Sequence, residues 1–251
     1  MLITEQSISI QGTKPYYEDN SGTQGNFAWV IDGATSLVGV DGDDGGVVSG
    51  FTSNITAALH EFSADADDGV DLRELLHQAV VEATRRVGPL DIRKPWDPPS
   101  AAMVLAHVSD KQVRLLQSAD VAWQVRDATG VVSMSVSEPV FAGFEAHNIA
   151  AIKKIAPGPE GDAQRREVFR ATRAKANAEG GYPVVQYGMA QPLAVKEGIV
   201  HADAPELVLY SDGWPRLYRN GLEVRLHGDV GFDDATFLHV RACLLYTSDA
   251  A

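Results

Sequence analysis

Two apolar segments of this chain each end in an aspartate followed by a glycine, and this pattern suggests chemistry. Asp32-Gly33 closes the run FAWVI, and Asp212-Gly213 closes the run ELVLY. A carboxylate at the end of a strand is held on a rigid element, and the glycine lets backbone groups approach an ion or a phosphate. Mg²⁺ and Mn²⁺ prefer oxygen ligands, and two of them about 3.5–4 Å apart need several carboxylates. The pattern therefore indicates a divalent-cation site at the rim of a sheet.

Further acidic residues occupy comparable positions. Glu18 and Asp19 precede the FAWVI run, Asp120 follows the run VRLLQ, and Asp233 precedes the last strand-like segment. A single Asp-Gly pair is a common turn and carries little weight. The order of all these positions along the chain is the informative signal.

That order resembles the protein phosphatase 2C family of metal-dependent serine/threonine phosphatases. The residues from about Gly12 to Val240 carry six short motifs in the family's order. They are GTKPYYED at 12–19 for G-x-R-x-x-N-E-D, WVIDG at 29–33 for the apolar strand with D-G, PSAA at 99–102 for G-S-T-A, ADVA at 119–122 for G-D-S-R, SDG at 211–213, and DDAT at 233–236 for D-N-x-T.

The resemblance implies a role for each matching residue and a pair of bound Mn²⁺ or Mg²⁺ ions. Asp32 would bridge both cations, with the Gly33 carbonyl as a further ligand, and Asp212 and Asp233 would complete the shell of the second. Glu18 and Asp19 would contact the cations through bound water, and Asp120 would bind a third cation more weakly. Lys14, which replaces the family's arginine, would bind the substrate phosphate.

The activity implied is hydrolysis of phosphoserine and phosphothreonine in proteins by a water that the cations activate, with Lys14, Asp32 and Asp212 as the catalytic set. Lys14 supplies a point charge instead of the arginine fork. Ala34 stands where some members have a histidine that protonates the leaving group. Ala119 and Val121 leave only the aspartate of the G-D-S-R turn. These departures keep two alternatives open, namely a pseudophosphatase that acts as a regulatory module and a hydrolase of small phosphate esters.

The elements that must position these residues follow from hydrophobic periodicity. Strands are predicted at residues 2–10, 27–31, 206–210 and 234–241, and amphipathic helices at 47–63 and 71–87. Four strand-like runs over residues 100–136 predict a β-meander, and residues 138–180 are mostly helical. Strands and helices in separate runs favour an α+β fold. The resemblance implies a four-layer αββα sandwich, in which helices flank two packed antiparallel sheets, and residues 1–242 are expected to form one domain.

Composition limits the partners. The 21 basic and 34 acidic residues give a net charge of −13, which disfavours nucleic acid. No apolar run is long enough to cross a membrane and no secretory signal is evident, so a cytoplasmic phosphoprotein substrate is expected. The single cysteine, Cys243, lies in residues 243–251, which resemble translated sequencing adapter and are set aside from the fold. The sequence leaves the oligomeric state open.

Competing motifs are weaker. The acidic stretch at 41–46 lacks the glutamate that a calcium loop needs at its twelfth position, which is Thr52. No spacing suits zinc, a serine hydrolase or a phosphate loop. The basic segment 165–175 is either a solvated face or a flap that attracts acidic phosphoproteins. In the second case, charge reversal at Arg170 and Arg173 is expected to raise KM for a phosphopeptide but not for a small aryl phosphate.

Overall fold

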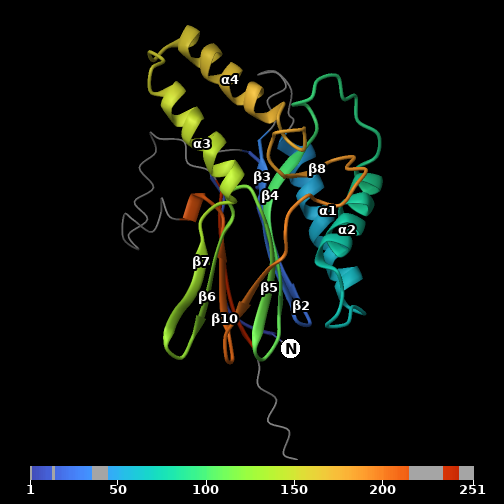
Figure 1. Ribbon diagram of the computed structural model, residues 1–251. Coiled ribbons are helices and arrows are strands. Elements are labelled where there is room, and N and C mark those ends of the chain that lie inside the picture. The colour runs from blue at the N-terminus through green and yellow to red at the C-terminus, as the bar shows by residue number, and fades with distance from the viewer. Residues whose placement is uncertain (1, 13–14, 36–44, 215–233, 243–251) are drawn as a thin grey trace, which may run out of the picture.

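The computed structural model describes residues 2–12, 15–35, 45–214 and 234–242. Within them, two antiparallel sheets pack face to face (Figure 1). The first, sheet A, has its strands in the order β1 (Leu2–Ile10), β11 (Ala235–Ala242), β10 (Glu206–Tyr210), β6 (Ala122–Asp127) and β7 (Gly130–Ser135).

Sheet B is the more deeply buried of the two. All nine residues of its central strand β4 are buried, because sheet A covers one face and helices cover the other. Its strands follow the order β2 (Asn20–Gln24), β3 (Phe27–Ala34), β4 (Ser100–Val108), β5 (Gln112–Ser118) and β9 (Gly198–His201), and the short β8 (Val185–Gln186) pairs with β4.

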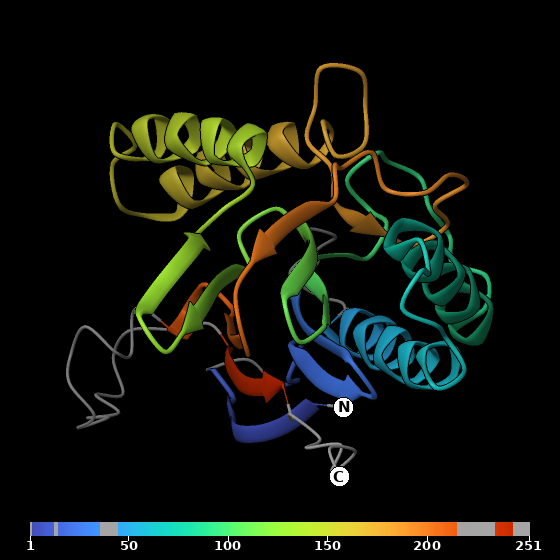
Figure 2. The same ribbon diagram turned by 60° about the horizontal axis from the view of Figure 1, so that its bottom comes forward.

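The four described helices form two pairs in different settings. Helices α1 (Gly45–Ser63) and α2 (Leu72–Val87) pack on sheet B. Helices α3 (Pro139–Ile152) and α4 (Pro159–Arg173) form a hairpin that follows β7 and lies well apart from the first pair (Figures 1 and 2). The structure thus confirms the α+β class and the two packed antiparallel sheets flanked by helices. No described helix is long and apolar enough to span a membrane.

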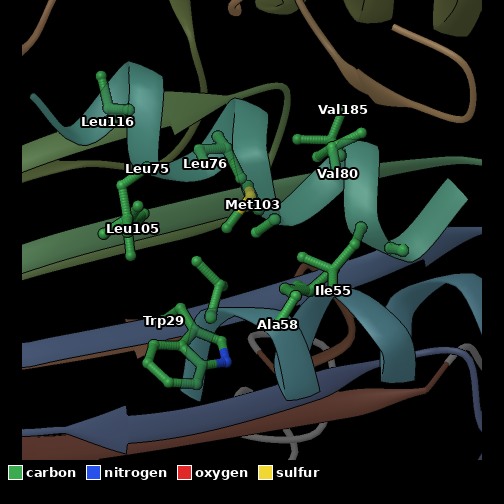
Figure 3. Packing of buried hydrophobic residues seen from close by; sticks show 14 of the residues in the cluster. Trp29, Ile55, Ala58, Leu75, Leu76, Val80, Met103, Leu105, Leu116 and Val185 are labelled. Atoms are coloured by element: carbon green, nitrogen blue, oxygen red, sulfur yellow. The ribbon is translucent and has the colours of Figure 1, made fainter. Parts of the chain in front are cut away.

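Alternation along β3 builds both halves of the core. Trp29 and Ile31 point to the helices, whereas Ala28 and Val30 point to sheet A. Figure 3 shows Trp29 facing Ala58 and other apolar side chains of α1, with β4 and α2 completing the cluster. Each fully buried large side chain of this kind contributes about 1.5–3 kcal/mol through removal of apolar surface from water.

Helix α2 shows why the sequence pattern was informative here. Asp71 caps it by accepting hydrogen bonds from the backbone amides of Arg73 and Glu74, and six apolar side chains with helical spacing are buried. The helix ends at Gly88, whose φ of 80° suits glycine. The predicted helices at 47–63 and 71–87 and the predicted strands at 2–10, 27–31, 206–210 and 234–241 are therefore confirmed within a few residues.

The predicted β-meander over residues 100–136 is wrong in its pairing. All four strands exist, but β4 pairs with β5 in sheet B and β6 pairs with β7 in sheet A. The chain crosses between the sheets at residues 119–121, where Ala119 takes a left-handed conformation with φ of 53°. Hydrophobic alternation predicts strands but does not reveal which sheet each strand joins, and this crossing places Asp120 between the two sheets.

Candidate active site

Asp32 is placed by the alternation of β3. It continues the row of Ala28 and Val30, whose side chains enter the core between the two sheets. The strand runs on through Gly33 to Ala34, which pairs with Ser100 of β4. Asp32 therefore lies on a paired strand, half-buried, at the end of the layer where the sheets meet.

Glu18 and Asp19 are buried carboxylates immediately before β2. Each is only 1% exposed. The Thr35 hydroxyl donates to Glu18 Oε2 at 2.7 Å, and the Thr52 hydroxyl of α1 donates to the Glu18 carbonyl at 2.8 Å. Adjacent ionised carboxylates in a buried position are costly unless positive charge offsets them. Their burial, with Glu18 packed against Gly33, favours a positive charge nearby.

Gly33 sits in a space that admits no side chain. A Cβ atom at this position would lie 2.6 Å from the Glu18 carbonyl oxygen and 2.9 Å from Val48 Cγ1 of α1. The glycine therefore allows β3, the Glu18 segment and the first turn of α1 to approach one another closely. Asp32 and Glu18 are held on either side of this contact.

Residues 211–213 and 234–236 interlock at the end of sheet A. The Ser211 amide donates to the Thr236 carbonyl at 3.0 Å, and the Thr236 amide donates to Ser211 Oγ at 2.9 Å. A Cβ at Gly213 would lie 2.1 Å from the Asp234 carbonyl oxygen, so glycine is required there. Asp212 is thereby fixed next to the start of β11.

Asp234 joins the two sheets at this end. Its carboxylate accepts hydrogen bonds from the Gly12 amide at 2.7 Å and from the Glu18 amide at 2.6 Å. Because the Glu18 segment leads into sheet B and Asp234 immediately precedes β11 of sheet A, these bonds bring the Asp32 and Asp212 motifs into one neighbourhood.

Tyr17, which replaces the family's asparagine, strengthens the same junction. Its hydroxyl shares a hydrogen bond with the Thr236 hydroxyl. Burial raises the pKa of Tyr17 to about 12, and the charges of Asp19 and Asp234 act in the same direction against the lowering by its hydrogen bonds. The phenol is therefore neutral at physiological pH and can donate its proton.

Asp120 lies on a turn that is tied to α3. The Ala119 carbonyl accepts from the Glu138 amide at 2.7 Å, and Gln117 Nε2 donates to the Val121 carbonyl at 2.9 Å. The charge of Asp120 acts on Tyr182, whose pKa is raised mainly by burial. Asp120 thus belongs to the side of the site that faces the α3–α4 hairpin.

The predicted site residues separate into two groups. The segments that carry Glu18, Asp32, Gly33 and Asp212 are linked by the contacts just described, Asp19 is buried next to Glu18, and Asp120 lies on the turn between the sheets. Lys14 and Asp233 are outside the described residues.

The donor chemistry suits Mg²⁺ or Mn²⁺, because the predicted side-chain ligands are carboxylates. Among the described residues, no three acidic or histidine side chains are close enough together to hold a metal ion. The predicted ligand set includes Asp233, which lies outside those residues. The roles of the individual ligands therefore stay predictions.

Sequence reasoning missed several supporting residues. Thr35 and Thr52 fix Glu18, and Asp234 joins the sheets, although only Asp233 was proposed from that motif. The sequence did contain a signal for Asp234. In the two-residue alternation of β11, Asp234 and the buried Thr236 fall on the same face as Leu238. Nothing in the sequence indicated the threonine contacts, which depend on how α1 packs.

Solved structures with a similar fold include serine/threonine phosphatases. No protein-family model and no curated protein sequence matches this chain. The Mycobacterium tuberculosis serine/threonine phosphatase PstP/Ppp aligns with 14% identity and a TM-score of 0.57, covering 96% of this chain and 98% of that one.

Two further structures agree. The PstP catalytic domain in complex with two manganese ions has 14% identity and a TM-score of 0.56, covering 96% of this chain and 99% of that one. The PPM Ser-Thr phosphatase MsPP from Mycobacterium smegmatis, in complex with cacodylate, has 13% identity and a TM-score of 0.53, with coverage of 94% and 96%. Over nearly its whole length, then, this chain has the fold of the PPM-type serine/threonine phosphatases, the family that its motifs resemble.

Proposed function

We propose that this protein is a metal-dependent phosphatase that hydrolyses phosphoserine and phosphothreonine in cytoplasmic proteins. The observation that supports it most is the meeting of the segments that carry Glu18, Asp32 and Asp212, which come from both sheets and are linked through Asp234, in a PPM-type fold. A single carboxylate at a strand end would not suggest this chemistry. Several from different segments do, and here Glu18 and its neighbour Asp19 are almost fully buried.

The reaction adds water to a phosphate monoester. The water oxygen forms a bond to phosphorus as the bond to the serine or threonine oxygen breaks, giving a free hydroxyl and inorganic phosphate. Two bound divalent cations would supply activation of the water and neutralisation of phosphate charge. Asp32 and Asp212 would hold these cations, and Lys14 would bind a phosphate oxygen. Since residue 34 is alanine, the leaving oxygen would take its proton from solvent.

The test is release of phosphate from a phosphothreonine peptide with Mn²⁺, with excess EDTA, and with the variant Asp212→Asn. We expect turnover that EDTA abolishes and that the variant lowers at least about 100-fold, since even the outer-shell partners of metal ligands are worth 10–100-fold. The matched control is Asp110→Asn, at an exposed position in the β4–β5 turn, which should keep full activity.

A regulatory module without catalysis is the second candidate. Ala34, Ala119 and Val121, which replace residues typical of the family, favour it. It predicts no turnover from folded protein on either a phosphopeptide or a small aryl phosphate. Turnover of the aryl phosphate alone would instead favour a hydrolase of small phosphate esters.

A further inference from the structure

Helix α4 carries four arginines, and the structure distinguishes the last of them from the others. Arg165 pairs with Asp162 and Arg170 pairs with Glu167, each at 2.5 Å and one turn back along the helix. Arg166 is exposed. Arg173, at the C-terminal end of α4, is half-buried, and no hydrogen bond or ion pair joins its guanidinium to another of the described residues.

Arg173 lies close to the candidate active site, near enough for the charge of Glu18 to act on it. It lines a cavity of about 330 Å³ together with Ala34 at the end of β3, Val48 of α1 and Pro99 before β4. The loop after α2 adds charged residues of both signs to the lining, namely Asp91, Arg93 and Asp97. Val48 is also the side chain that packs against Gly33, next to Asp32. In Figure 1 the end of α4 lies beside the ends of β3 and β4. The guanidinium therefore reaches the same end of the sandwich as the carboxylates.

The electrostatic interactions of Arg173 agree with a position close to Glu18. Burial lowers the pKa of Arg173 from its ordinary value, while the charges of Tyr182 and Glu18 act to raise it. An arginine remains protonated throughout the physiological range even so. A half-buried guanidinium keeps its charge at some cost in solvation, which an anionic ligand would offset.

We propose that Arg173 binds the phosphoryl group of the substrate, a role that rests on the proposed phosphatase function. The planar guanidinium can donate two parallel hydrogen bonds to phosphate oxygens, whereas the lysine at the family's arginine position offers only a point charge. Lys14 of the first motif and the guanidinium of Arg173, at the end of α4, would then both bind the phosphate. The ligand class is a phosphate monoester dianion, and the contact is to the phosphate and not to the peptide.

The choice of phosphate as the ligand sets the kinetic test. Arg173→Ala is expected to raise KM about 10- to 100-fold for both an aryl phosphate and a phosphothreonine peptide, since a hydrogen bond to a charged group is worth one to two orders of magnitude. Arg173→Lys should recover part of the loss. Arg166→Ala removes the same charge from an exposed position of the same helix and should leave both values unchanged. A rise for the peptide alone, or no rise for either substrate, would overturn the proposal.

A binding measurement separates this proposal from the phosphatase function itself. Inorganic phosphate is titrated calorimetrically into wild type, Arg173→Ala and Arg166→Ala in the presence of Mg²⁺, and thermal melting of each variant is recorded. We expect Arg173→Ala to weaken phosphate binding about 10-fold or more with an unchanged melting temperature. That result supports the role of Arg173 even if the wild type shows no turnover. Equal phosphate affinity in all three proteins, or a weakening that only follows a lowered melting temperature, would refute it.

Discussion

The two helix pairs of this molecule differ in how they are held. Helix α2 buries six side chains against α1 and sheet B, whereas no apolar side chain of α3 is buried and several on α3 and α4, including Ile149 and Phe169, are exposed. The α1–α2 side supports Glu18 and Asp32 through Thr52 and Val48. The α3–α4 side presents Arg173 and is anchored through contacts of Phe141 and Phe144 with Tyr182.

From this difference we infer that the α1–α2 side holds the cation ligands and that the α3–α4 hairpin contacts the substrate. Ligands for cations must be held within a fraction of an ångström, and a fully packed sheet provides that rigidity. Groups that contact a variable substrate are more often on elements with fewer buried contacts, which can open locally at low cost in free energy. We therefore expect substitutions on the α1–α2 side to affect folding and those on the hairpin to affect substrate binding.

The largest effect should come from the core under α1. Trp29→Ala is expected to lower the free energy of unfolding by about 3–5 kcal/mol, because the indole is fully buried between β3 and α1. Ile149→Ala on α3 should change it by less than about 0.5 kcal/mol, because that side chain is 47% exposed. Denaturant unfolding of both variants measures the contrast. Comparable losses would show that the hairpin is as well packed as the core.

A smaller effect distinguishes the helix caps. Asp71→Ala and Glu138→Ala each remove a side chain that accepts a backbone hydrogen bond at a helix start, which is worth about 1 kcal/mol. For Asp71 the loss should appear in global unfolding, since α2 belongs to the core. For Glu138 it should appear as faster hydrogen exchange in α3 with little change in global stability. If the two variants lower global stability equally, the halves unfold as one unit.

Much of the fold could be predicted because its signals are local. The apolar run of β3 and the apolar stripe of α2 each depend on neighbouring residues, and both were confirmed. The assignment of β5 and β6 to different sheets was not predictable in this way, because it depends on the crossing at Ala119 and on packing between distant segments. The strands β2, β8 and β9 were missed as well, since they are short or polar.

The site was predictable to the extent that it consists of motifs. The positions of Glu18, Asp32 and Asp212 followed from their order along the chain, while their individual roles stay predictions. The hydrogen bonds of Thr35 and Thr52, and the approach of Arg173 from α4, depend on tertiary packing. The basic segment of α4 was treated as one surface from its sequence. Only the structure distinguishes Arg173 from Arg170.

The most direct test of the central claim, that carboxylates from both sheets form one divalent-cation site, is a calorimetric titration of Mn²⁺ into the folded, EDTA-treated protein and into Asp32→Asn. Our account predicts saturable binding of about two ions per chain in the wild type, and loss or strong weakening of that binding in the variant with no loss of folded structure. Folded wild-type protein that binds no Mn²⁺, or a variant that binds it as well as the wild type, would contradict the account.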